Sequence, residues 1–217
     1  MLVPATGWYD GEYPDLAEPG RTFRRDRRGP HGMSDATILL LPGLYGSGAG
    51  HWQTLWERQL PRARRVSQRD WDAPRRIEWV AQLDAALRET TGPVLLAAHS
   101  LGCATAVWWA ALHAAESHAA RVRGALLVAP PDVERAAAPA PVRDFSPMPV
   151  MRLPFPAIVV ASSDDPWCQP ERARGWAGQW GAQWQDIGAR GHINADSGLG
   201  DWPEGQCWLR QLAASGT

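Results

Sequence analysis

The sequence predicts a single-domain α/β fold built on a doubly wound, mostly parallel sheet. From residue 37 onward, short apolar runs of strand length alternate with stretches whose apolar residues recur at helical spacing. Such alternation produces βαβ units, which place helices on both faces of a parallel sheet. The chain has 217 residues, of which 45% are hydrophobic and 21% charged, so it is long enough for one full core and does not resemble a disordered protein.

The expected strands are apolar runs that end at turn signals. The first covers residues 37–41 and is followed directly by Pro42 and Gly43. A second, weaker candidate covers residues 64–68. The remaining expected strands cover residues 93–98, 124–129, 155–161 and 183–187.

The expected helices fill the intervals between these strands. The clearest is an apolar stripe formed by Ile77, Val80, Leu83 and Leu87. The other expected helices cover residues 52–60, 101–116, 171–180 and 204–214. Residues 130–156 contain eight prolines and are expected to form an irregular loop, which in α/β proteins often covers the functional site.

The first 33 residues differ in composition and pattern from the rest of the chain. They combine Gly, Pro, five Arg and five acidic residues, and their apolar residues follow neither a helical nor a strand period. We interpret residues 1–33 as an irregular, dispensable leader upstream of a start at Met33, and residues 34–217 as the folded domain. A basic contact patch at residues 21–28 is the alternative interpretation.

Charge and cysteine content exclude several classes of function. The formal net charge is −1 and all 22 basic residues are arginine, which argues against nucleic-acid or polybasic membrane binding and excludes lysine-dependent Schiff-base and P-loop chemistry. Cys103, Cys168 and Cys207 are too widely spaced for a metal pair or a disulfide framework and fit a reducing compartment. No apolar run reaches the length of a membrane span, and no secretory signal is apparent, so a cytoplasmic location is expected.

The strongest chemical signal is a serine at a strand-to-helix turn. The expected strand at residues 93–98 leads through His99 into Ser100 and then into a helix that carries Gly102 near its start. This is the context of a nucleophile elbow, in which a strained turn lifts the serine hydroxyl out of the backbone and small neighbours allow strand and helix to approach. Ala98 stands where the usual G-x-S-x-G pattern has its first glycine. We therefore expect Ser100 to be a nucleophile.

A nucleophilic serine needs a base, and the base needs an orienting acid. In this type of fold the three occur in the order Ser, Asp, His, each after a strand. Asp165 follows the expected strand at 155–161, and His192 follows the strand at 183–187. Asp164 is the competitor for the role of Asp165, whereas His99 lies on the wrong side of the turn to act as the base and is interpreted as a packing residue.

Two further pairs of residues are expected around this serine. The backbone N–H groups of Leu101 and Leu44 are candidates for an oxyanion hole, because one follows the nucleophile and the other lies in the loop after the first strand. The chain contains 13 Trp against 3 Phe and 3 Tyr. Most are expected in the core, but Trp52 and Trp167 flank the site in sequence and are candidate substrate-binding residues.

One rival interpretation is a dinucleotide-binding oxidoreductase. Residues 43–50 are rich in glycine, and Asp70 lies 20 residues beyond Gly50, where a ribose ligand is expected. The glycines follow the spacing G-x-x-G-x-G rather than G-x-G-x-x-G, and this interpretation leaves Ser100, Asp165 and His192 without a role.

Four motifs in order resemble the small, lidless serine hydrolases of the α/β-hydrolase superfamily, typified by mammalian retinoblastoma-binding protein 9 and its bacterial relatives. They are Leu-Pro-Gly-Leu-Tyr-Gly-Ser-Gly-Ala-Gly-His-Trp-Gln at residues 41–53, His-Ser-Leu-Gly at 99–102, Ser-Asp-Asp-Pro at 163–166 and Gly-His-Ile-Asn at 191–194. The resemblance covers about residues 36–214.

The resemblance implies a compact α/β-hydrolase without a cap domain. It also implies that Ser100 is the nucleophile, Asp165 the orienting acid and His192 the base, and that the substrate is a small-molecule ester or related acyl compound. Carboxylesterase-like hydrolysis of this kind needs no cofactor or metal. A second rival remains, a protein-binding module on a hydrolase scaffold, since fold alone does not determine function.

Overall fold

The computed structural model describes residues 35–215, and the expected leader at residues 1–33 lies outside them. Within these described residues, six strands form one sheet in the order β2-β1-β3-β4-β5-β6, and every neighbouring pair is parallel. The strands are β1 (Thr37–Leu41), β2 (Ala63–Arg65), β3 (Val94–His99), β4 (Val122–Val128), β5 (Ala157–Ala161) and β6 (Gln183–Asp186). The predicted parallel sheet is therefore confirmed.

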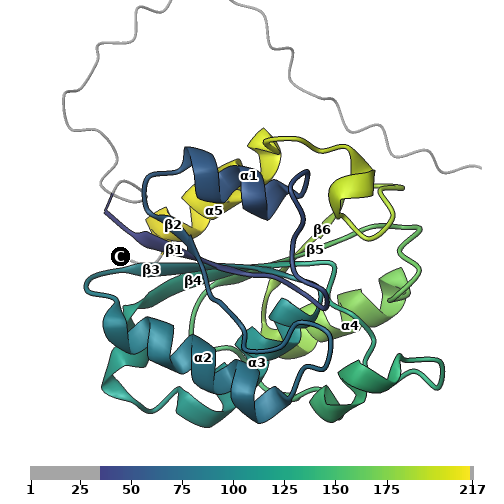
Figure 1. The fold of residues 1–217 in the computed structure, drawn as a ribbon, viewed down its shortest axis with the longest axis horizontal. Helices are drawn as coiled ribbons and strands as arrows, with labels where there is room; N and C mark the ends of the chain where they lie inside the picture. The colour runs from purple at the N-terminus through teal and green to yellow at the C-terminus, as the bar shows by residue number, and fades with distance from the viewer. Residues whose placement is uncertain (1–34, 216–217) are drawn as a thin grey trace, which may run out of the picture.

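Helices cover both faces of the sheet (Figure 1). The α-helices of the described part of the chain are α1 (Trp52–Gln59), α2 (Arg76–Glu89), α3 (Leu101–His113), α4 (Pro170–Trp180) and α5 (Pro203–Ser215). Figure 1 shows α1 and α5 on one face and α2, α3 and α4 on the other. Three short 3-10 helices that the sequence did not indicate are η1 (Ser117–Arg121), η2 (Ala140–Phe145) and η3 (Ala195–Ser197). None of the helices within residues 35–215 is long and apolar enough to cross a membrane.

The core consists of two apolar layers separated by the sheet. Successive side chains of a strand point to opposite faces, so Leu39 and Leu41 of β1 join the layer under α2, α3 and α4, whereas Ile38 and Leu40 join the layer under α1 and α5. Because both faces are covered, each central strand contains a run of at least four consecutive buried residues that are apolar or small, such as Ile38–Leu41 in β1. This is why they were recognisable in the sequence.

The edge strand β2 is shorter than expected. The sequence suggested residues 64–68, but the strand covers Ala63–Arg65 and pairs only with β1. Its three residues are half-buried. An edge strand has one hydrogen-bonded neighbour, so fewer contacts define its end.

The order of the strands creates a natural place for a site. The chain runs from β1 outward to β2 and then returns to β3 on the other side of β1, so the direction of winding reverses between β1 and β3. In open α/β sheets, ligands bind at the carboxyl ends of the strands at such a switch point. The loop after β1 and the turn after β3 meet at this point.

Candidate active site

Ser100 occupies the tight turn between β3 and α3. Its backbone has φ of 53° and ψ of −124°, a conformation that non-glycine residues seldom adopt. Its N–H donates to the carbonyl oxygen of Val128 at 2.9 Å, which ties the turn to β4. A Cβ atom on Gly102 would lie 2.1 Å from the carbonyl oxygen of Leu41, so only glycine permits α3 to start this close to β1.

Ser100, His192 and Asp165 form a continuous chain of hydrogen bonds. The Nε2 atom of His192 lies 2.8 Å from the Oγ atom of Ser100, and its Nδ1 atom lies 2.9 Å from both carboxylate oxygens of Asp165. A carboxylate only accepts, so Nδ1 carries the proton and Nε2 accepts from the Ser100 hydroxyl. Asp165 is 5% exposed and also accepts from the N–H of Trp167, which fixes its orientation. The structure brings these three predicted residues together.

Asp164 occupies a different position from its neighbour. One carboxylate oxygen accepts from the Ser162 hydroxyl at 2.6 Å and from the N–H of Gly191 at 2.7 Å. These hydrogen bonds, with the Ser162 hydroxyl foremost, lower the pKa of Asp164. Asp164 thus joins the loop after β5 to the loop that carries His192, while Asp165 alone reaches the imidazole.

The loop after β1 lies directly against the serine. A Cβ atom on Gly43 would lie 2.7 Å from the Ser100 Cβ atom and 3.2 Å from the Leu101 nitrogen, so any side chain here would collide with the turn. Leu44 follows and lines the pocket above Ser100. No hydrogen bond among residues 35–215 uses the N–H of Leu44 or of Leu101, the first residue of α3. Both donors are therefore available at the position predicted for an oxyanion hole.

A buried glutamine that sequence reasoning missed supports this loop. The Gln53 amide donates to the carbonyl oxygens of Leu41 (3.0 Å) and Ala97 (2.8 Å), at the carboxyl ends of β1 and β3. Its amide oxygen accepts from the Ser47 hydroxyl at 2.7 Å. Gln53 is completely buried and satisfies backbone groups that flank the turn. Nothing in its sequence position indicates this, because its partners come from distant strands.

Two neutral histidines pack behind His192. The ring centroids of His51 and His99 are 4.6 Å apart, and those of His99 and His192 are 4.9 Å apart. His99 donates from Nε2 to the backbone carbonyl of His192 at 2.8 Å. Burial, followed by the nearby Arg65 charge, lowers the pKa of His51 to about 4, and burial lowers that of His99 well below its ordinary value. His99 is a packing residue, as expected, and it supports the loop of His192.

The expectation that Trp52 contacts substrate is wrong. Trp52 is 1% exposed, does not line the pocket, and donates from its indole to the carbonyl oxygen of Ile193 at 3.0 Å. It packs edge-on against Trp56 and Trp202 in the layer under α1 and α5. Trp52 is the first residue of α1, and its side chain points toward the sheet. Its position in the sequence, close to the loop after β1, does not reveal this direction.

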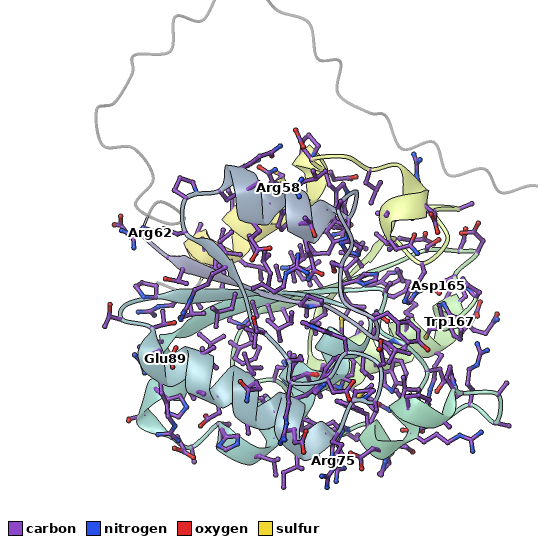
Figure 2. The ribbon with its side chains drawn as sticks, in the orientation of Figure 1. Arg58, Arg62, Arg75, Glu89, Asp165 and Trp167 are labelled. Atoms are coloured by element: carbon purple, nitrogen blue, oxygen red, sulfur yellow. The ribbon has the colours of Figure 1, made fainter. Side chains whose placement is uncertain are left out.

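Trp167 takes the position expected of it. It is 39% exposed, lines the pocket, and lies beside Asp165 near the carboxyl ends of the strands (Figure 2). Its ring centroid is 6.3 Å from that of His192. Trp167 can therefore offer flat apolar contact to a molecule bound at Ser100.

The pocket over Ser100 has a volume of about 260 Å³. Its wall combines the loop after β1, the proline-rich loop after β4, and the loops that carry Trp167 and His192. Apolar side chains from Leu44, Pro131, Pro139, Val142 and Trp167 form much of this wall. Within residues 35–215, no cluster of His, Cys, Asp and Glu has the geometry of a metal site.

The features behind the dinucleotide interpretation have local structural roles. Asp70 accepts from the N–H groups of Asp72 and Ala73 at 2.8 and 2.9 Å, which closes its own turn. Gly46 adopts φ of 74° in the loop that reaches Ser100. The glycines shape the loop beside the serine, and Asp70 stabilises the turn before α2.

Comparison with known proteins relates the chain to hydrolases. The family model described as "Serine hydrolase" matches residues 38–211. A YdeN-like hydrolase from Pectobacterium atrosepticum is 32% identical with a TM-score of 0.70, over 84% of this chain and 91% of that chain. No curated protein is significantly similar in sequence.

More distant solved structures share the fold. The ydeN gene product of B. subtilis is 18% identical with a TM-score of 0.63, over 82% of this chain and 98% of that chain. A thermophilic esterase from Thermogutta terrifontis is 16% identical with a TM-score of 0.59, over 82% of this chain and 90% of that chain. At these identities the likeness concerns the fold alone.

Proposed function

The chain belongs to the serine hydrolase family, within the α/β-hydrolase superfamily, and from that premise we propose that it cleaves an ester or a related acyl bond through an acyl-enzyme on Ser100. The observation that carries this proposal is the unbroken hydrogen-bond chain from the Ser100 hydroxyl through His192 to Asp165. In that arrangement the serine hydroxyl has a base within 2.8 Å, and the base is held in the tautomer it needs.

Acylation uses these groups in sequence. His192 Nε2 takes the Ser100 proton while Oγ forms a bond to the substrate carbonyl carbon, and the carbonyl electron pair moves onto oxygen. The N–H groups of Leu44 and Leu101 donate to this oxyanion, and the N-terminus of α3 adds its positive end. The tetrahedral species then collapses, the bond to the leaving oxygen breaks, and His192 returns the proton to that oxygen.

Deacylation repeats the steps with water. His192 removes a proton from a water molecule, whose oxygen attacks the acyl carbon, and the proton then returns to Ser100 as the acid is released. Asp165 stays ionised throughout and stabilises the positive charge on His192 in both half-reactions.

The pocket supports a small-molecule acyl substrate. Its volume of about 260 Å³ and its partly apolar wall suit a short acyl ester. No cap domain interrupts the alternation of strands and helices within residues 35–215, and the covering comes from the loop between β4 and β5. Carboxylesterase-like activity on compact substrates is therefore the expected specificity.

A panel of p-nitrophenyl esters from acetate to decanoate tests the proposal. We expect wild-type protein to hydrolyse the shorter esters, and Ser100→Ala and His192→Ala to lose this activity while retaining the wild-type melting temperature. Absence of turnover by wild-type protein, or undiminished turnover by Ser100→Ala, would contradict the proposed function.

A further inference from the structure

The active-site pocket contains a single arginine, Arg135, among the described residues that line it. Arg135 lies in the proline-rich loop after β4, and its guanidinium carbon is 5.5 Å from the centre of the Trp167 ring. One terminal N–H group donates to the backbone carbonyl of Pro166 at 2.5 Å. The side chain is thus held against the loop of Asp165 and Trp167 instead of extending into solvent.

Arg135 has no carboxylate partner within the part of the chain that the structure describes. Among residues 35–215, no carboxylate oxygen lies within 4.0 Å of its guanidinium nitrogens, although acidic residues stand close by in the same loop. Glu134 pairs with Arg172 and also accepts from the N–H of Met148. The neighbouring acidic side chain is therefore already engaged elsewhere.

Asp132, the acidic residue among the described residues that line this pocket, has partners of its own. One of its carboxylate oxygens accepts from the N–H of Glu134 and lies 3.7 Å from the Nε atom of Arg172. Arg172 is thus shared by Asp132 and Glu134, whereas Arg135 makes no ion pair among residues 35–215 and keeps its guanidinium available to a ligand.

The surroundings of Arg135 favour an anion as its partner. A guanidinium carries five N–H donors in a planar fork that matches a carboxylate, and within residues 35–215 only one donor of Arg135 is used. Apolar side chains of Pro139, Val142 and Trp167 share the pocket, and the attraction between opposite charges is stronger beside such groups than in open water.

We propose that this pocket selects esters that carry a carboxylate within a few carbon atoms of the scissile bond, and that Arg135 binds this carboxylate. The inference rests on the proposed ester hydrolysis at Ser100. The carboxylate can belong to the acyl part, as in a dicarboxylic acid monoester, or to the alcohol part, as in an acylated hydroxy acid. The shared chemistry is an anionic ester.

Matched pairs of substrates test the proposal. On the acyl side, monomethyl glutarate is compared with its neutral amide, methyl 4-carbamoylbutanoate; on the alcohol side, 4-acetoxybutanoate is compared with 4-acetoxybutanamide. Each pair has the same size and differs in one charge. We expect the acid-to-amide ratio of kcat/KM to be about tenfold or more for wild-type protein in at least one series, as for a charge-assisted hydrogen bond, and to decrease as salt is added.

Substitutions assign the preference to Arg135. We expect Arg135→Gln to lower the ratio to about one and Arg135→Lys to retain part of it, because lysine keeps the charge without the fork. Arg174→Gln is the matched control, because this substitution removes the same charge as Arg135→Gln. Arg174 is exposed on α4 and does not line the pocket. Its ratio should equal that of wild-type protein.

Two results would overturn the proposal. The first is a wild-type ratio of one or less in both series. The second is an unchanged ratio in Arg135→Gln; if the activity on acid and amide then falls equally, Arg135 only supports the Asp165 loop. Failure of the proposed function itself gives a different result. In that case wild-type protein would not hydrolyse the neutral esters faster than Ser100→Ala does.

Discussion

Two adjacent aspartates perform separate tasks at the site. Asp165 accepts from the imidazole of His192, whereas Asp164 accepts from the Ser162 hydroxyl and the N–H of Gly191. One carboxylate therefore holds the imidazole of His192, and the other holds two loops together. This division predicts that the same substitution has different consequences at the two positions.

Asp165→Asn should lower kcat by about 10⁴-fold with little change in melting temperature. The amide can donate to Nδ1 of His192, which transfers the ring proton to Nε2 and removes the acceptor for the Ser100 hydroxyl. Asp164→Asn should lower the melting temperature and reduce kcat far less. Steady-state kinetics and thermal unfolding of both variants check this, and a larger loss of kcat in Asp164→Asn would reverse the assignment.

The sequence predicted the residues whose roles depend on chain order. Ser100, Asp165 and His192 each follow a strand, and parallel strands bring their carboxyl ends to one edge of the sheet. Gln53 and His51 were missed because their importance arises from contacts with distant strands. Trp52 was predicted to contact substrate because it lies close to the loop after β1 in the sequence. Closeness in sequence does not determine the direction in which a side chain points.

At the scale of elements, the site depends on the close approach of β1, β3 and α3. Gly102 permits this contact, since its Cα lies where a side chain would meet the carbonyl oxygens of Leu41 and Pro42. Those atoms belong to the backbone at the end of β1 and cannot rotate away. The glycine is therefore required for packing, beyond its place in a motif.

Gly102→Ala should destabilise the protein by about 3 kcal/mol or more, because the new methyl group would lie 2.1 Å from the Leu41 oxygen and force α3 away from β1. Gly175→Ala is the matched control. Gly175 lies within α4, and an added methyl group there would meet no atom within 4 Å apart from its chain neighbours and the backbone of its own helix. Alanine is favoured over glycine in helices by up to about 1 kcal/mol. Urea unfolding of both variants measures the difference, and equal stabilities would contradict the packing argument.

The predicted elements agree best with the structure where burial is complete. β1, β3 and β5 consist mainly of buried apolar residues, and their positions match the sequence expectations closely. The edge strand β2 and the 3-10 helices were poorly predicted, because partial exposure and turn geometry leave weak patterns. The expected helix at residues 101–116 ends at His113.

At the scale of the whole molecule, tryptophan builds both layers of the core. Trp52, Trp56 and Trp202 pack together under α1 and α5, while Trp176 and Trp180 stack on the opposite face. Most of the 13 tryptophans are thus structural, and Trp167 is one that reaches the pocket. The high tryptophan content is explained mainly by packing.

Buried neutral histidines make the stability of the fold depend on pH. The pKa of His51 is lowered from 6.5 to about 4 in the folded protein, and that of His99 is lowered as well. Between these two pKa values the unfolded chain binds more protons at His51 than the folded protein does. The contribution of neutral His51 to the free energy of unfolding is therefore complete above pH 6.5 and decreases as the pH falls toward 4. Between about pH 7.5 and pH 5, His51 accounts for a loss of about 2 kcal/mol.

His51→Asn should reduce this loss by a similar amount. His51 caps α1 by accepting from the N–H of Gln53, and asparagine can preserve the cap while removing the titrating ring. Urea unfolding of wild-type and variant protein at the two pH values provides the comparison. Identical decreases in stability would show that the burial of His51 does not govern the acid sensitivity.

We propose above that Ser100 is the nucleophile and that His192 activates it. The most direct measurement is covalent labelling with a fluorophosphonate, followed by peptide mass spectrometry to locate the adduct. We expect one adduct on Ser100 in wild-type protein, none in Ser100→Ala, and labelling slowed by orders of magnitude in His192→Ala. An adduct on another residue, or equal labelling of wild-type protein and Ser100→Ala, would contradict the account.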